Sequence, residues 1–265
     1  NEPWMYETGR RIGSRTMYKF WGFYDETADM RYQEEFGRPI ANHGITLVPG
    51  DCVYVDLNAD GEINSNDATR DIGYTDMPEY TAGLNTGFSW KNFDFSMQWT
   101  GAWNVDRMLD EFRRPLGDTN EKGLLLYQYD TTWRSSADTF TAKFPRTSSL
   151  HASNNYAGSD LYLINASYLR LKSVEIGYNF NFPFMKKLKM DNCRLYVNGY
   201  NLITITGFKW GDPESRQSSR PNYPLTRVFN IGLKLGFSYF MNNMMGHLSK
   251  WFIATLAGVA LFSSS

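Results

Sequence analysis

Apolar and polar residues alternate with a period of two in several stretches of this chain. The clearest stretch is 228–240, where Phe, Ile, Leu or Tyr fills every second position from Phe229 to Tyr239, and Asn, Gly, Lys or Ser fills the positions between. This period predicts a β-strand whose two faces meet different surroundings. A length of about ten residues suits a tilted strand that crosses a bilayer, because strands of soluble sandwiches are usually about five or six residues long.

Four stretches upstream repeat the alternation. Stretches 82–90 and 93–100 are separated only by Lys91 and Asn92, a two-residue connector of the kind that closes a β-hairpin. Stretch 169–180 shows the pattern again, and 193–202 shows it more weakly. No stretch of the first 240 residues repeats apolar residues at helical spacing. The predicted fold is therefore all-β and antiparallel.

Composition and connection lengths favour a transmembrane β-barrel over a large soluble β-sandwich or propeller. Aromatic residues make up 16% of the chain, yet its mean hydropathy is −0.47. A barrel wall gives this profile because an apolar outer face is averaged with a small, polar inner face. Long polar segments at 47–77, 107–159 and 207–222 alternate with short turns. We expect these segments to be long, structureless extracellular loops, which soluble sandwiches seldom carry.

The charge balance and the absence of catalytic motifs exclude two other classes of protein. The chain has 27 Lys and Arg against 28 Asp and Glu, so it lacks the basic excess of a nucleic-acid-binding protein. Its three histidines lie far apart, and neither a G-x-S-x-G nor an H-E-x-x-H motif is present. We predict that the protein is not an enzyme and has no nucleic-acid partner.

One polar segment carries the residues of a calcium-binding loop. Residues 56–67 read DLNADGEINSND, which places oxygen donors at positions 1, 3, 5, 7 and 12 of such a loop. The predicted ligands are the side chains of Asp56, Asn58, Asp60 and Asp67 and the main-chain carbonyl of Glu62. The alternative is an ordinary turn rich in Asp and Asn, which is common in surface loops.

The neighbours of these donors favour a structural calcium site over a calcium sensor. Gly61 permits the sharp turn at position 6, and we expect Ile63 to anchor the loop by packing inward. The flanking segments are not amphipathic helices, so a sensor of the helix–loop–helix type is not predicted. The sequence instead predicts a Ca²⁺ ion that stiffens an extracellular loop.

A series of short motifs follows in order along the chain. It comprises VYVDLNADG at 53–61, IGY at 72–74, PEY at 78–80, FDFS at 93–96, TG at 100–101, ASYLRLKSV at 166–174, NL at 201–202 with Thr204 and Thr206, GDPE at 211–214 and YP at 223–224. Together with a last strand that ends on Phe240, these motifs resemble the C-terminal part of SusC/RagA-type TonB-dependent outer-membrane transporters. The resemblance covers about residues 37–240.

The resemblance implies a function in import. Transporters of this family form a 22-stranded barrel in the outer membrane, closed by an N-terminal plug through which TonB acts. They take up oligosaccharides or peptides, and a SusD-like surface lipoprotein covers the extracellular mouth. This sequence contains only about six to eight plausible strands and no plug, and a wall of that size would leave two open edges in lipid. We therefore expect residues 1–240 to be the C-terminal portion of a longer transporter barrel.

Residues 241–265 differ from the rest of the chain. A polar start containing Lys250 precedes an apolar core at 251–262 and a run of small residues. The core is too short for a spanning helix and has the layout of a secretory signal peptide. We expect this tail, which resembles the signal of a SusD-like lipoprotein, to be an addition that is not part of the barrel.

Two other functions remain open at the level of sequence. One is a small, self-contained outer-membrane barrel that serves as an adhesin or anchor. The other is a soluble, calcium-stabilised β-module that binds carbohydrate. Trp103, Trp133 and Trp210 could stack on sugar rings, although packing within the loops or at the membrane interface is the commoner role of such residues.

Overall fold

The computed structural model describes residues 2–109, 125–187, 190–215, 225–237 and 253–256, which divide into two compact units. The sheet unit consists of Tyr80–Trp103, Tyr168–Gly207 and Tyr223–Ser265, and the loop unit consists of Asn1–Glu79, Asn104–Ser167 and Phe208–Asn222. Among the described residues, no helix is long and apolar enough to span a bilayer.

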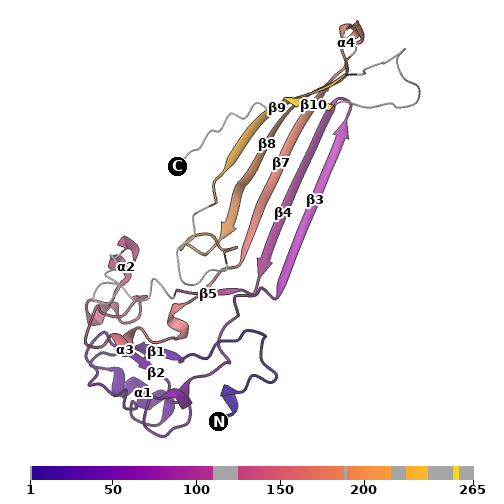
Figure 1. The fold of residues 1–265 in the computed structure, drawn as a ribbon. Helices are drawn as coiled ribbons and strands as arrows, with labels where there is room; N and C mark the ends of the chain where they lie inside the picture. The colour runs from indigo at the N-terminus through magenta and orange to yellow at the C-terminus, as the bar shows by residue number, and fades with distance from the viewer. Residues whose placement is uncertain (1, 110–124, 188–189, 216–224, 238–252, 257–265) are drawn as a thin grey trace. The chain divides into compact units, whose positions relative to one another are not determined.

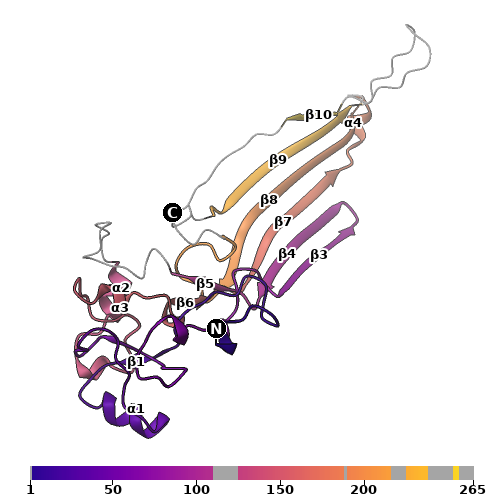
Figure 2. The same cartoon turned by 60° about the horizontal axis from the view of Figure 1, so that its bottom comes forward.

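The sheet unit is a single antiparallel sheet (Figures 1 and 2). In the part of the chain that the structure describes, its six strands lie in the order β10-β9-β8-β7-β4-β3. They are β3 (Tyr80–Trp90), β4 (Phe93–Trp103), β7 (Tyr168–Phe180), β8 (Met190–Thr206), β9 (Val228–Phe237) and β10 (Ile253–Leu256). Each strand pairs with the next strand of this sheet along the chain, although β4 and β7 are separated in sequence by a long segment that belongs to the loop unit.

The structure confirms the predicted strands and extends most of them. Lys91 and Asn92 close the β3–β4 hairpin, and Lys91 adopts the positive φ of 53° that such a tight turn requires. The weakly alternating stretch 193–202 lies inside β8, whose 17 residues make it the longest described strand. A short helix, α4 (Pro183–Lys187), lies in the connection between β7 and β8. The last three residues of stretch 228–240 lie outside the described residues.

The long polar segments are not structureless, and this expectation was wrong. They fold together as the loop unit, whose extended elements are two short antiparallel pairs, β1 (Phe20–Phe23) with β2 (Cys52–Tyr54) and β5 (Asp106–Met108) with β6 (Leu163–Asn165). Its helical elements are η1 (Pro3–Met5), α1 (Ala28–Phe36), η2 (Ser65–Asp67), α2 (Leu126–Thr131), η3 (Ser136–Asp138), α3 (Ala152–Asn155) and η4 (Asp160–Tyr162). The hydrophobic periodicity of the sequence does not predict this fold, because each element is short and its apolar partners come from distant segments.

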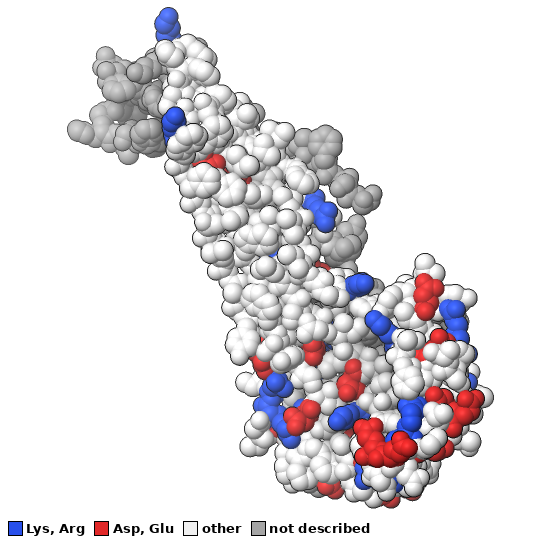
Figure 3. Space-filling model, turned by 180° about the vertical axis from the view of Figure 1, so that it is seen from behind, with Lys and Arg blue, Asp and Glu red and all other residues white. Residues whose placement is uncertain are grey.

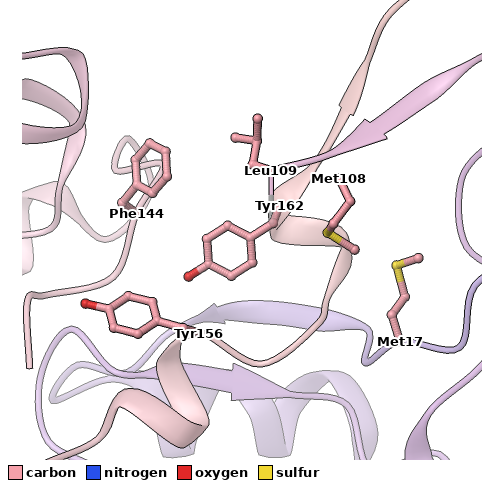
Figure 4. Close-up of a cluster of buried hydrophobic side chains, with 6 residues drawn as sticks. All are labelled: Met17, Met108, Leu109, Phe144, Tyr156 and Tyr162. Atoms are coloured by element: carbon pink, nitrogen blue, oxygen red, sulfur yellow. The ribbon is translucent and has the colours of Figure 1, made fainter. Parts of the chain in front are cut away.

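Two hydrophobic clusters form the core of the loop unit. The first contains six buried side chains, drawn in Figure 4: Met17, Met108, Leu109, Phe144, Tyr156 and Tyr162. The second contains Phe23, Cys52, Tyr54 and Trp133. Trp210 packs against the first cluster and Trp133 belongs to the second, so both tryptophans pack within the loops. Trp103 lies at the end of β4 and is 39% exposed.

A buried carboxylate joins two segments of the loop unit that are about a hundred residues apart. Asp51 is fully buried and accepts hydrogen bonds from Arg146 Nε at 2.7 Å, from Asn155 Nδ2 at 2.9 Å and from the N–H of Val48 at 2.9 Å. His151 Nδ1 lies 2.6 Å from Asp51 Oδ2, the oxygen that also accepts from Val48. Burial alone would raise the pKa of Asp51, but these hydrogen bonds outweigh it and lower the pKa below its usual range.

The prediction for residues 241–265 concerns a segment that is mostly outside the described residues. Within it, the structure describes only β10, which pairs antiparallel with β9 from Ile253 opposite Gly236 to Leu256 opposite Leu233. The division of the chain at residue 240 stays a prediction.

Candidate functional site

The strand register places the large apolar residues of the sheet unit on one face. One row of directly paired residues runs across five strands through Phe88, Phe95, Ile176, Val197 and Ile231. The large apolar side chains on this face are well exposed, and twelve of them, between 39% and 62% exposed, are Leu84, Phe88, Trp90, Phe93, Ile176, Leu195, Val197, Ile203, Ile205, Phe229, Ile231 and Leu233. An exposed apolar surface that continues over a whole sheet is typical of contact with lipid or another apolar partner.

The opposite face of the same sheet is polar. The neighbouring row contains Gly87, Ser96, Glu175, Asn198 and Asn230. The Asn198 side chain donates to Glu175 Oε2 at 3.2 Å, and the Asn230 side chain donates to Asn198 Oδ1 at 2.9 Å. Hydrogen bonds between side chains therefore cross from β7 to β9. The two faces together match the alternation read from the sequence.

A cluster of three charges lies on this polar face. Arg194 on β8 donates through Nε to Asp94 on β4 at 2.7 Å and through Nη2 to Glu175 on β7 at 2.7 Å. Gly177 lies directly opposite Asp94, and a Cβ atom at this glycine would stand 2.2 Å from the Asp94 carboxylate. The missing side chain is what allows Arg194 to reach across β7. The sequence pattern gives no sign of this cluster, because its members are up to a hundred residues apart.

A second glycine on the polar face makes room for an aromatic ring. Tyr196 on β8 is paired directly with Gly232 on β9. A Cβ atom at Gly232 would lie 2.2 Å from Tyr196 Cζ, so the ring occupies the space that any other residue's side chain would need. The ring and the glycine thus form a matched pair across the two strands.

The loop unit brings together three of the predicted calcium ligands. Asp56, Asp60 and Asp67 each offer one carboxylate oxygen, and these oxygens lie within 4.8 Å of one another. Asp56 and Asp67 are buried, whereas Asp60 is exposed. Asn58 lies beside them and donates from its amide to Asp60 Oδ2 at 2.7 Å. The side chain of Glu62 is not a member of this group, and the donor predicted at that position is its main-chain carbonyl.

Hydrogen bonds from the main chain hold these side chains in a tight loop. Asp56 accepts from the N–H groups of Ala59 at 2.7 Å and Gly61 at 3.1 Å. Asp67 accepts from the N–H groups of Leu57 at 2.9 Å and Asn64 at 2.9 Å, which closes the loop. Gly61 has a φ of 85°, so it makes the sharp turn expected at position 6.

The carboxylates of the loop respond differently to their surroundings. Burial raises the pKa of Asp67, and the nearby Asp56 raises it further, although three main-chain N–H groups oppose this effect. The pKa of Asp60 is lowered because the Glu62 N–H and the Asn58 side chain donate to it. Bringing several carboxylates together disfavours their ionisation, which a divalent cation would relieve. An all-oxygen donor set of this kind fits Ca²⁺.

Neighbouring segments fix the loop within its unit. The N–H of Asp56 donates to the Tyr32 hydroxyl of α1 at 3.2 Å, and Arg38 donates to the Asp56 carbonyl. The Asn42 N–H donates to the Gly61 carbonyl at 2.8 Å, and the Ile63 N–H donates back to Asn42 at 2.8 Å. Ile63 also packs against the second hydrophobic cluster, which confirms its predicted inward position.

Comparisons with known proteins agree with this two-faced sheet. The chain is 28% identical over 246 residues to TonB-dependent receptor P3 of Formosa agariphila, covering 86% of this chain and 22% of the relative. It is 28% identical over 206 residues to TonB-dependent receptor SusC of Bacteroides thetaiotaomicron, covering 77% of this chain and 18% of the relative. In fold, it is similar to the solved RagAB peptide transporter, with a TM-score of 0.59, 18% identity and coverage of 84% of this chain and 22% of that one. The chain is related to SusC/RagA-type TonB-dependent receptors.

The match covers only part of each relative. The chain spans about a fifth of the length of the curated receptors it matches. A second solved structure, the RagAB peptide importer in an "open-open" state, gives a TM-score of 0.58 at 20% identity. No family model matches the chain. SusC/RagA-type receptors are proteins of the outer membrane and are not enzymes, and both predictions made from the sequence agree with this relationship.

Proposed function

We propose that this chain forms part of the barrel wall of an outer-membrane transporter that imports its substrate with energy delivered through TonB. The observation that carries the proposal is the sheet unit, in which long strands expose a continuous apolar face and pair their polar side chains on the other. A lipid-facing wall around a polar lumen needs this division. The relationship to SusC/RagA-type receptors supports the same function.

The proposed substrates are oligosaccharides or peptides. The structural relatives are a peptide transporter and a peptide importer, which supports the peptide class. We also propose that a SusD-like surface lipoprotein is the partner, by analogy with the SusC/RagA-type receptors. TonB would act through the plug region of the complete receptor.

Deletion of the gene tests the transport function. Cells that lack it are expected to lose uptake of one oligosaccharide or peptide mixture, and the complete receptor gene is expected to restore that uptake. Deletion of tonB should abolish the restored uptake, because the substrate would then lack an energy source. Unchanged uptake after the first deletion, or uptake independent of TonB, would contradict the proposal.

The soluble carbohydrate-binding module is not favoured. A protein of that kind would have to keep in water the twelve large apolar side chains that the sheet exposes on one face. The relatives are receptors of the outer membrane, which is where such a face is stable.

We further propose that the loop at 56–67 binds a structural Ca²⁺ ion in the extracellular part of the transporter. The side chains of Asp56, Asn58, Asp60 and Asp67 and the carbonyl of Glu62 would be its ligands. The close approach of three carboxylates in a loop closed by main-chain hydrogen bonds supports this site. Its role would be to stabilise the loop unit, because α1 and the second hydrophobic cluster are attached to the loop.

Calcium removal tests this part of the proposal on the complete receptor. In calcium at about a hundred times its dissociation constant, the loop unit is expected to gain about 2.7 kcal/mol, measured as slower amide hydrogen exchange at 52–70. Chelation should remove this protection, and Asp56→Asn should make exchange insensitive to calcium. Asp130→Asn, which changes an exposed carboxylate on α2, is the matched control. Equal exchange with and without calcium in the unaltered receptor would refute the site.

A further inference from the structure

Two connections lie side by side at one end of the sheet unit. The β3–β4 turn at Lys91 and Asn92 meets the end of β7, where the Asn179 N–H donates to the Asn92 carbonyl at 2.8 Å. The chain then leaves β7 and forms α4, Pro183–Lys187, before β8 begins. This end of the sheet therefore consists of short connections.

A row of aromatic rings follows this end of the apolar face. Phe93 packs against Tyr178 with ring centroids 4.7 Å apart, and Tyr178 packs against Phe180 at 4.8 Å. Phe180 then stacks on Phe182 at 5.3 Å, and Phe182 stacks on Phe184 of α4 at 5.6 Å. The last two rings are 47% and 55% exposed. The apolar face thus continues from the strands onto the connection.

Lysines stand beside these exposed rings. Lys91 Nζ lies 4.8 Å from the ring centroid of Trp90, which is 62% exposed, and Lys187 is exposed at the end of α4. Neither lysine has an ion-pair partner among the described residues. In Figure 3, charged side chains are few over the sheet, and basic side chains lie at its upper end.

The acidic side chains that the structure describes near this end of the sheet are paired with an arginine. Asp94 and Glu175 both bind Arg194 on the polar face, on the opposite side of the sheet from the aromatic row. The apolar side of this end therefore carries unpaired positive charge next to exposed aromatic rings. Rings of this kind settle at the boundary between acyl chains and headgroups, and lysine side chains beside them extend to the headgroup phosphates.

We propose that this end of the sheet binds the anionic headgroups of phospholipids in the leaflet that it contacts. Phe182, Phe184 and Trp90 would occupy the acyl boundary, and Lys91 and Lys187 would hold the phosphates. This lipid preference would fix the depth of the wall in the membrane. It rests on the sheet being a membrane wall and not on the substrate that the transporter carries.

Native mass spectrometry of the complete receptor in nanodiscs tests this proposal. The nanodiscs contain phosphatidylcholine with roughly one quarter phosphatidylglycerol, and the ratio of the two lipids that stay bound is measured. The unaltered receptor is expected to retain phosphatidylglycerol preferentially. Lys91→Gln and Lys187→Gln should each reduce that preference by about five-fold, which corresponds to about 1 kcal/mol per basic side chain. Lys234→Gln, on the polar face of β9, is the matched control and should leave it unchanged.

Three outcomes would overturn the proposal. They are bound lipid in the same ratio as the nanodisc, an equal effect of Lys234→Gln, and removal of the preference by inorganic phosphate, which would indicate a site for free phosphate. Substrate uptake by the same variants separates the two proposals. If the lysine variants lose the lipid preference but transport normally, both proposals stand. If the unaltered receptor transports normally but shows no lipid preference, only the lipid proposal is refuted.

Discussion

The two units of this chain are stabilised in opposite ways. The sheet unit exposes its large apolar side chains and pairs its charged ones, Asp94, Glu175 and Arg194, on the other face. The loop unit buries its apolar side chains in two clusters and also buries a hydrogen-bonded carboxylate, Asp51. The difference reflects the surroundings of each unit. Apolar side chains can face lipid, whereas in water they are driven into a buried core. This contrast can be tested on the complete receptor by substitutions in each unit.

The largest effect is expected in the core of the loop unit. Phe144→Ala removes a ring that is 3% exposed and should destabilise the unit by about 3–5 kcal/mol, because it leaves a cavity in the first cluster. Hydrogen exchange at residues 105–109 and 156–163 measures the loss. Phe140→Ala removes a ring that is 79% exposed and should have little effect. Similar losses for both variants would show that the cluster is not the core.

A charge on the lipid-facing side of the sheet should have the next largest effect. Ile176→Lys places an ammonium group on the apolar face and should cost about 2–4 kcal/mol if the site lies near the bilayer midplane. Ser96→Lys places the same charge on the polar face, directly opposite Glu175, and should cost little. Urea unfolding in lipid vesicles measures both. Equal costs would mean that the two faces do not meet different surroundings.

The glycine beneath the charge cluster should have an intermediate effect. Gly177→Ala would force a methyl group to within 2.2 Å of Asp94 and 2.4 Å of Arg194, so the ion pair would have to move. We expect a loss of about 1–3 kcal/mol in the same urea assay. Gly83→Ala, on the same polar face, has its nearest neighbour at 3.8 Å and serves as the control. A harmless Gly177→Ala would show that the cluster does not need this gap.

The smallest effect concerns pH and separates the two units again. His43 accepts a hydrogen bond from the Tyr54 N–H through Nε2 at 3.0 Å, and its Nδ1 lies 2.7 Å from the Ala41 carbonyl, so the folded unit holds a neutral ring. Burial lowers the pKa of His43. A lowered pKa means that this stability is complete above the ordinary value of about 6.5 and is lost as the pH falls through the folded value.

Hydrogen exchange at 52–56 measures this loss between neutral and mildly acidic pH. Exchange there should accelerate on acidification, while the strands of the sheet unit should respond much less. His43→Gln should flatten the dependence, because glutamine does not titrate. The pKa of Asp51 is also lowered, so further acidification should act in the same direction. Faster exchange at higher pH, beyond the intrinsic chemical rate, would contradict the assignment.

The sequence predicts the sheet unit far better than the loop unit. Alternation at 82–90, 93–100 and 169–180 marks both faces of each strand, and the dipeptide at Lys91 marks the hairpin, so strands and turn follow from local pattern. Local pattern also locates the loop at 56–67, because five oxygen donors keep fixed spacing. Whether that loop holds calcium stays a prediction.

The fold of the loop unit cannot be predicted from local sequence pattern, because its contacts join segments that are far apart in the chain. Asp51 meets Asn155 across 104 residues, and β5 pairs with β6 although more than fifty residues separate them, as Asp106 opposite Asn165 shows. No periodic signal accompanies such contacts, so the segments between the strands read as loops. The same reason hides the ion pair between Asp94 and Arg194, although the strand faces correctly place both residues on the polar side.

The pairing of Tyr196 with Gly232 has a consequence for assembly. A ladder of backbone hydrogen bonds alone would allow β8 and β9 to slip by two residues without turning either face. Such a slip would bring the ring of Tyr196 against Asn230 or Lys234, which fill the space that the glycine leaves free. A misaligned hairpin is thereby penalised before further strands are added. The correct register of β8 and β9 is therefore favoured by the fit between the Tyr196 ring and the space at Gly232.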